Sequence, residues 1–176
     1  AGLNLALAKI HYSNSRFRTN IGLMAGDYPK ANLAAEEKWA RIIYEANAGV
    51  KLSSKKELWF DVGVLPSHIG AETAIGKDNT AATRSIVADN SPYYETGARI
   101  SYQPNSKWNF AMLALTGWQR ITVPANQQSP GFGTQIIYAH SSKLYFNSST
   151  YAGQIFTGTK NVVRLYHNLY STVALN

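Results

Sequence analysis

Hydrophobic and polar positions alternate along most of the chain with a period of two, the pattern of a half-buried β-strand. The longest example covers residues 38–52, where Ala, Ile, Tyr, Val and Leu occupy every second position. Comparable alternation predicts eight further strands, near residues 3–12, 17–25, 58–64, 94–102, 108–118, 132–140, 143–152 and 162–175. The sequence therefore predicts an all-β fold, an antiparallel up-and-down meander of about nine strands, most of them longer than the ~5–6 residues of a typical globular strand.

The connections between these strands alternate in length. Tight polar turns fall near residues 13–15, 53–56, 104–106 and 141–142, and longer links fall near residues 27–37, 66–93, 119–131 and 153–161. Bacterial outer-membrane barrels show this asymmetry, with short periplasmic turns and longer outer loops. The pattern favours a transmembrane β-barrel.

Composition supports a barrel in lipid. Only 15% of the residues are charged, 11 are Tyr, and there is no Cys, so disulfide and thiol chemistry are excluded. No run approaches the ~18 consecutive apolar residues of a transmembrane helix. A soluble lipocalin-like barrel, which would place its charges outward, remains the more distant alternative.

The two faces of the strands carry different residue types. The polar face is expected to line a hydrated lumen, with these residues as candidates: Arg16, Arg18, Arg41, Glu45, Lys51, Asp61, Glu95, Arg99 and Arg164. Aromatic residues near strand ends of the apolar face are expected to form the membrane girdle: Trp108, Trp118, Tyr94 and Tyr102. The facing of the first strand stays open, because Lys9 and His11 share a phase with Leu5 and Leu7.

The number of strands bears on the domain organisation. Single-chain bacterial barrels have an even number of strands, whereas nine are predicted here. We therefore expect residues 1–176 to be a single β-barrel domain that is an incomplete fragment of a longer chain and a larger barrel. A miscounted strand is the alternative explanation.

The segment 66–93 is too long for a plain connector. Asn79 or Thr80 can cap a short helix over about residues 80–89. If the loop folds into the lumen, five charged residues would narrow the pore: Glu72, Lys77, Asp78, Arg84 and Asp89. The other hypothesis is a loop that packs on the rim and seals the sheet.

Residues 61–118 and the three that follow carry a series of short motifs. They contain Val-Gly-x-x-Pro-Ser, Ile-Gly-x-Glu, Lys-Asp-Asn, Thr-Arg-Ser-Ile, Asn-Ser-Pro-Tyr and Glu-Thr-Gly-Ala-Arg, then Thr-Gly-Trp-Gln-Arg at 116–120. This region resembles the OmpL-like β-barrel porin family of bacterial outer membranes, departing from its Asn-Gly-Trp-Gln-Arg only in Thr for Asn. The resemblance implies a porin-type barrel in the bacterial outer membrane, and it supplies no substrate.

Catalytic and cofactor motifs were not found. The four His residues stand singly (His11, His68, His140 and His167), and neither a metal-binding spacing nor a GxSxG or phosphate-binding loop is present. The carboxylates of Glu45, Asp61 and Glu95 share their wall with Arg and Lys, which favours salt bridges over a glycosidase pair. We expect no enzyme, no metal and no cofactor.

Two functions remain open. The first is a passive diffusion channel for small hydrophilic solutes, with a weak anion preference from the Arg excess on the inner face. The second is a non-conducting structural or binding barrel in an outer-membrane assembly. Expected partners are outer-membrane lipid and either other envelope proteins or further copies of the chain. Nucleic acid is not expected, because the basic residues are scattered.

Overall fold

Nine antiparallel strands form one sheet in the order of the sequence. The computed structural model describes residues 2–79, 83–123, 125 and 129–174. The strands are β1 (Ala6–Ser13), β2 (Phe17–Ala25), β3 (Ile43–Lys51), β4 (Glu57–Pro66), β5 (Tyr94–Gln103), β6 (Trp108–Leu115), β7 (Gly131–Ala139), β8 (Leu144–Phe156) and β9 (Asn161–Val173). The all-β, up-and-down prediction is confirmed. Across the described residues no pairing joins β1 to β9, so the sheet is not closed.

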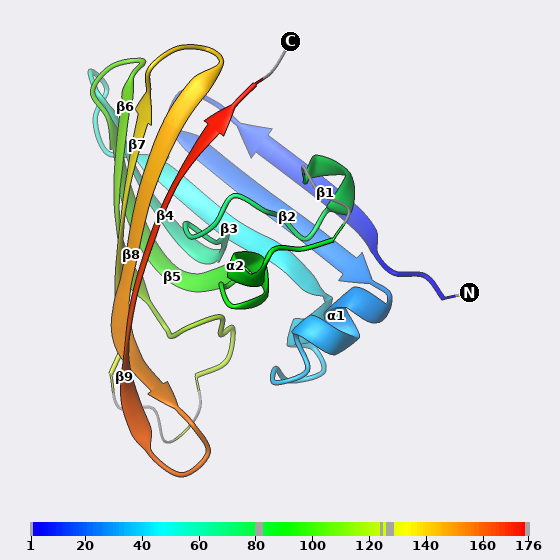
Figure 1. The fold of residues 1–176 in the computed structure, drawn as a ribbon. Helices are drawn as coiled ribbons and strands as arrows, with labels where there is room; N and C mark the ends of the chain where they lie inside the picture. The colour runs from blue at the N-terminus through cyan, green and yellow to red at the C-terminus, as the bar shows by residue number, and fades with distance from the viewer. Residues whose placement is uncertain (1, 80–82, 124, 126–128, 175–176) are drawn as a thin grey trace.

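The sheet curls into a trough with two different ends (Figure 1). At one end, called the turn end, tight turns at 14–16, 52–56, 104–107 and 140–143 connect the strands. At the other, called the loop end, the links are 26–42, 67–93, 116–130 and 157–160. The last link is shorter than the sequence predicted because β8 continues to Phe156.

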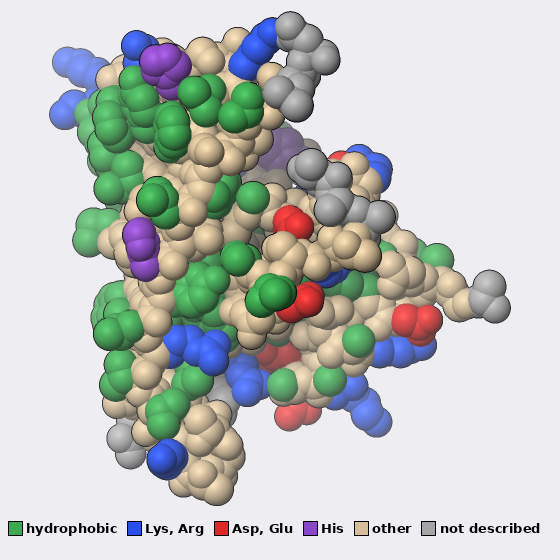
Figure 2. Space-filling model, viewed as in Figure 1, with side chains coloured by type: hydrophobic (Ala, Val, Ile, Leu, Met, Phe, Trp, Pro, Cys, Tyr) green, Lys and Arg blue, Asp and Glu red, His purple; other side chains and the backbone are tan. Residues whose placement is uncertain are grey.

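Large hydrophobic side chains gather on the convex face of the trough (Figure 2). Met112, Leu165 and Leu169 are 70%, 76% and 69% exposed there. Alternate residues on the same strands point to the concave side and are mostly buried or half-buried. The facing of β1 is also resolved, because Lys9 bonds to Glu45 on the concave wall.

Short helical elements interrupt the links at the loop end. They are α1 (Asp27–Asn32), the 3₁₀ turns η1 (Ala40–Ile42) and η2 (Gly76–Asp78), and α2 (Ile86–Asp89). No helix in the described part of the chain is both long and apolar enough to cross a membrane.

Two expectations about these elements need correction. The strand expected over 38–52 begins at Ile43, because η1 occupies the preceding residues. The helix expected over 80–89 is reduced to α2, and its first residues, 80–82, lie outside the described part. Its cap is Ser85, whose Oγ accepts a hydrogen bond from the amide of Ala88, and not Asn79.

Two apolar clusters hold the links against the sheet. At the loop end, Tyr28 and Leu33 from the segment containing α1 pack with Met24, Val64 and Tyr94. On the concave wall, Ile69 from the 67–93 link packs with Ala111, Leu113, Leu115 and Tyr151. The second cluster brings the beginning of the 67–93 link onto the inside of the trough.

Candidate functional site

The concave wall carries an ion-paired centre at Asp61, whose side chain is almost fully buried. Arg18 donates from Nε to Oδ1 at 2.6 Å and from Nη2 to Oδ2 at 2.5 Å, while Arg99 Nη2 lies 3.3 Å from Oδ2. Gly49 lies between Arg18 and Asp61 in the register. A Cβ atom at Gly49 would lie 2.2 Å from Asp61 Oδ1, so only glycine leaves room for this pair to meet across β3.

Two further ion pairs lie on the same wall. Lys9 Nζ contacts Glu45 at 2.5 Å across the small Gly22, and Lys51 pairs with Glu57 nearer the turn end. Charges of both signs therefore alternate along the concave side of β1–β5. A surface of this kind suits water and small polar solutes better than lipid.

The structure places seven of the nine predicted lumen residues on strands of this wall: Arg18, Glu45, Lys51, Asp61, Glu95, Arg99 and Arg164. Arg16 instead lies exposed in the turn between β1 and β2. Arg41 lies in η1, where its guanidinium donates to the carbonyls of Glu36 and Ala34. Both residues lie outside the strands; they were predicted on the wall because the alternating pattern continues beyond the strand ends.

His68 fixes the start of the 67–93 link to the concave wall. Its Nδ1 lies 2.7 Å from Glu95 Oε2 on β5, and its Nε2 lies 2.8 Å from the carbonyl oxygen of Thr150 on β8. Its own carbonyl accepts hydrogen bonds from Gln135 Nε2 at 2.9 Å and Ser149 Oγ at 2.6 Å. This set of contacts, called the His68 anchor, ties the link to three strands.

The chemistry of the anchor indicates a protonated imidazole. A carboxylate and a carbonyl are acceptors only, so each ring nitrogen has to carry a hydrogen. Burial by itself lowers the pKa of His68, but the hydrogen bond and negative charge of Glu95, with the Thr150 carbonyl, outweigh it and raise the pKa above its ordinary value. Arg99 opposes this increase. The protonated form of His68, which forms a buried ion pair with the Glu95 carboxylate, therefore persists to higher pH than in a free imidazole.

The five charged residues expected to narrow the pore have different surroundings. Glu72 accepts hydrogen bonds from the amide and hydroxyl of Ser85 and so braces the link internally. The guanidinium of Arg84 lies 4.6 Å from the ring centre of Tyr93 and donates to the Ala74 carbonyl. The remaining three are exposed: Lys77, Asp78 and Asp89.

Glu36 is buried and joins two links of the loop end, 26–42 and 116–130, to the first residue of β5. Its carboxylate accepts from the amides of Ile121 and Thr122 at 2.9 and 3.0 Å, from the Thr122 hydroxyl at 2.8 Å and from the Tyr94 hydroxyl at 3.0 Å. Tyr94, predicted for the membrane girdle, is 5% exposed. It is covered because the links fold over the first residue of β5.

Trp118 also departs from its predicted place in the girdle. β6 ends at Leu115, so the alternation no longer sets the direction of Trp118. Its ring packs against Tyr151 and Tyr166 on the concave side, at centroid distances of 4.9 and 5.1 Å, with the guanidinium of Arg164 4.7 Å from the ring centre. A pocket of about 360 Å³ adjoins this cluster, lined by Ala35, Asp89, Asn90, Ser91, Trp118, Gln119, Arg120 and Arg164.

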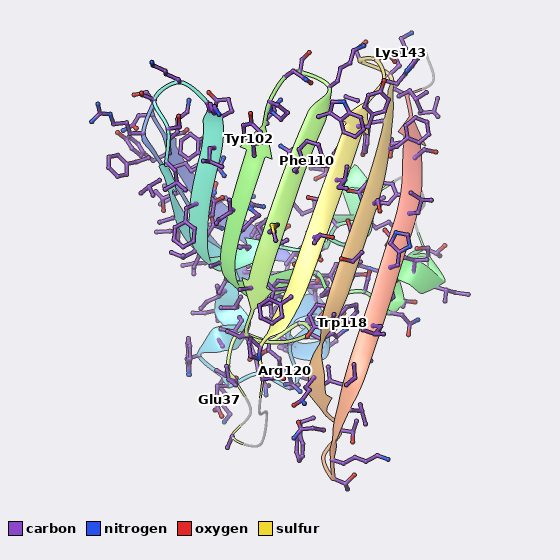
Figure 3. All side chains as sticks on the ribbon, turned by 90° about the vertical axis from the view of Figure 1, so that its left-hand side faces the viewer. Glu37, Tyr102, Phe110, Trp118, Arg120 and Lys143 are labelled. Atoms are coloured by element: carbon purple, nitrogen blue, oxygen red, sulfur yellow. The ribbon has the colours of Figure 1, made fainter. Side chains whose placement is uncertain are left out.

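The other two girdle candidates lie towards the turn end. Trp108 begins β6 directly after a tight turn, and Tyr102 lies near the end of β5 (Figure 3). The Trp108 ring stacks with Phe110 at a centroid distance of 5.7 Å and packs against Tyr138 at 4.6 Å with an interplanar angle of 38°. Tyr102 is the register partner of Phe110. These aromatic residues form a band where the convex face approaches the turns.

Comparison with known proteins adds one finding. A family model described as "Putative beta-barrel porin-2, OmpL-like" matches residues 1–176, the whole chain. The chain belongs to this family. No curated protein and no solved structure matches it. Membership in this porin family confirms the resemblance over 61–118, extends it to the full sequence and implies an outer-membrane β-barrel.

Among the described residues of this member of the porin family, no group of three or more His, Asp and Glu residues that could hold a metal ion is found. Sequence reasoning missed two structural residues, His68 and Glu36. The sequence feature that could have indicated His68 is its position directly after Pro66-Ser67, where β4 ends. No local pattern indicates Glu36, because its partners Tyr94, Ile121 and Thr122 are far away in the chain.

Proposed function

We propose that this chain forms the wall of an outer-membrane channel through which small hydrophilic solutes diffuse passively. The observation that carries the proposal is the contrast between the two faces of one sheet. The convex face exposes large hydrophobic side chains, and the concave face carries ion pairs centred on Asp61. Family membership supports the same function. Such a channel needs no enzymatic step and no cofactor.

Because the sheet is open, the channel requires further strands to close the barrel. In lipid every backbone donor and acceptor needs a partner, so the free edges of β1 and β9 have to be covered by further strands. A barrel of about eight strands is filled by its own side chains, and larger barrels can hold water. We therefore propose that these nine strands are part of a larger barrel with an aqueous lumen.

The 67–93 link would form the constriction. The His68 anchor holds its beginning against the wall, and the exposed Lys77, Asp78 and Asp89 present charges of both signs. Mixed charge at a narrow point limits solute size more than it selects for one sign of charge.

A weak preference for anions would come from Arg164. Its guanidinium lies over Trp118, and no ion pair to it is found among the described residues. The other cations of the wall strands are paired: Lys9, Arg18, Lys51 and Arg99. In asymmetric salt, the reversal potential should indicate slight anion selectivity. Arg164→Gln should reduce it, and Lys30→Gln, at an exposed position of α1, should leave it unchanged.

Conductance of the purified full-length protein in planar bilayers tests the channel itself. Discrete conductance steps that disappear when the protein is heat-denatured before addition would support the proposal. A folded protein that inserts without conducting would instead support a non-conducting barrel that binds envelope proteins or further copies of itself. That second function is favoured by one observation, the apolar packing of Ile69 inside the trough. Cation preference would contradict the role of Arg164.

A further inference from the structure

The positive charge of the protein is concentrated at the turn end. The four turns contain five exposed basic residues and no Asp or Glu: Arg16, Lys55, Lys56, Lys107 and Lys143. In every turn a Lys or Arg immediately precedes the next strand. The four links of the loop end carry six acidic and seven basic residues, so their charge nearly cancels. The turns therefore supply five of the seven net positive charges.

The basic turns lie directly beyond the aromatic band. Trp108 follows Lys107 and packs against Phe110 and Tyr138, and Figure 3 shows Lys143 at the same end of the sheet. Aromatic belts of transmembrane barrels lie at the membrane–water interface. Side chains just outside such a belt are at the depth of the lipid headgroups.

The first two turns also form a pocket. It has a volume of about 470 Å³ and is lined by Ser15, Arg16, Lys51, Ser53 and Ser54. The amide of Lys51 donates to the carbonyl of Arg16 at 2.8 Å and so holds the two turns together. Lys51 is paired with Glu57, so the Arg16 guanidinium and the three Ser hydroxyl groups are the groups of this pocket suited to a phosphate oxygen.

We propose that the turn end of the barrel binds anionic phospholipid headgroups, with the phosphate of one lipid in the pocket between the first two turns. The five turn cations, which lie in segments that contain no Asp or Glu, would attract a negatively charged leaflet. This attraction decreases beyond a Debye length of about 8 Å at physiological ionic strength. The proposal requires that the barrel crosses the membrane and is independent of whether it conducts.

The test uses the purified full-length protein in vesicles of phosphatidylcholine that contain a trace of either spin-labelled phosphatidylglycerol or spin-labelled phosphatidylcholine. The fraction of motionally restricted label measures the lipid bound to the protein surface. We expect severalfold stronger association of phosphatidylglycerol at low salt, declining as salt is added. In a variant with the five turn cations replaced by Gln, the two labels should associate equally.

The matched control replaces basic residues of the loop end, Lys30, Lys38, Lys77 and Lys160, by Gln. It should retain the preference, because these residues lie at the opposite end. Mobility on a gel before and after boiling shows whether each variant is folded, and the salt titration of the unaltered protein tests the proposal without any variant. Equal association of both labels with the unaltered protein, or equal loss in both variants, would overturn the proposal.

Discussion

At the scale of single residues, glycine decides where charged side chains can meet. Gly49 makes room for the Arg18–Asp61 pair, and Gly133 makes room for the His68 ring, which a Cβ atom would approach to 2.6 Å. Gly63 has a different reason: its φ of 123° lies in the left-handed region, and a Cβ atom there would lie 2.2 Å from the Ala46 carbonyl. Glycine residues on the concave face therefore leave the space that the larger polar side chains occupy.

Replacing the carboxylate at the centre of the wall should be costly. In Asp61→Asn, Arg18 and Arg99 lose the negative charge that both contact, and we expect the free energy of unfolding to fall by about 3 kcal/mol. Urea titration of the protein in vesicles measures this loss. Asp78→Asn, which removes a carboxylate from an exposed pair with Lys77, should cost less than about 1 kcal/mol. Equal losses would contradict a central role for Asp61.

The His68 anchor should depend on pH. The folded-state pKa of His68 is raised above the ordinary 6.5, so its contribution to stability is complete below pH 6.5 and is lost as pH rises through the folded-state pKa. Hydrogen exchange of the amides of residues 68–70 should therefore accelerate at alkaline pH beyond the intrinsic pH effect. In His68→Gln this additional acceleration should be absent. Persistence of the effect in that variant would assign it to another group.

The individual contacts of His68 could not be predicted from the sequence. Histidine has no neighbouring motif here, and its partners Glu95 and Thr150 are far away in the chain. By contrast, Asp61, Arg18 and Arg99 were predicted on one face, because strand alternation alone places them there. Residue roles that follow from local periodicity are visible in the sequence, whereas those that depend on how a link folds back are not.

At the scale of elements, the strands were predicted well and the links poorly. The range 17–25 agrees with β2, and 94–102 agrees with β5 to within one residue. Errors occur where alternation continues beyond the paired residues, as before Ile43 and after Leu115. α1 was not predicted, because its six residues are too few to establish a helical period.

One substitution in β7 should detach the 67–93 link from the concave wall. Gly133→Val adds side-chain atoms where the His68 ring lies, so we expect the link to leave the wall while the sheet remains paired. Limited proteolysis should then cut between residues 67 and 93 much faster, with unchanged β-sheet circular dichroism. Gly76→Ala is the control, because a Cβ atom there meets nothing within 4 Å. Equal cleavage of both variants would indicate that the anchor does not hold the link.

At the scale of the whole molecule, hydrophobic and charged residues occupy different faces and ends of the sheet. Hydrophobic side chains cover the convex face, ion pairs lie on the concave face, and five basic residues lie in the turns of the turn end. The sequence predicted the first two through alternation and the family through its motifs. It predicted that the basic residues are scattered over the lumen wall and the turns, and the structure shows which five of them lie in turns.

The assignment of the convex face can be tested on a single strand. Met112→Arg places a charge on the exposed side of β6, where lipid would surround it, at a cost of about 2–4 kcal/mol near the middle of the bilayer. Asn109→Arg places the same charge on the opposite side of β6 and should be tolerated. The yield of heat-modifiable, folded protein in outer-membrane extracts compares the two variants. Similar yields would mean that the convex face does not contact lipid.

The neighbour-only pairing of the nine strands also has a kinetic consequence. Every strand is bonded to the strand directly before or after it in the chain, so no pairing has to wait for a remote segment to arrive. Local pairing of this kind lowers the entropy lost before the first contacts are formed. The β8–β9 hairpin has 13 residues in each strand and only four between them. It is therefore the natural nucleus from which the remaining strands can be added in order, one at a time.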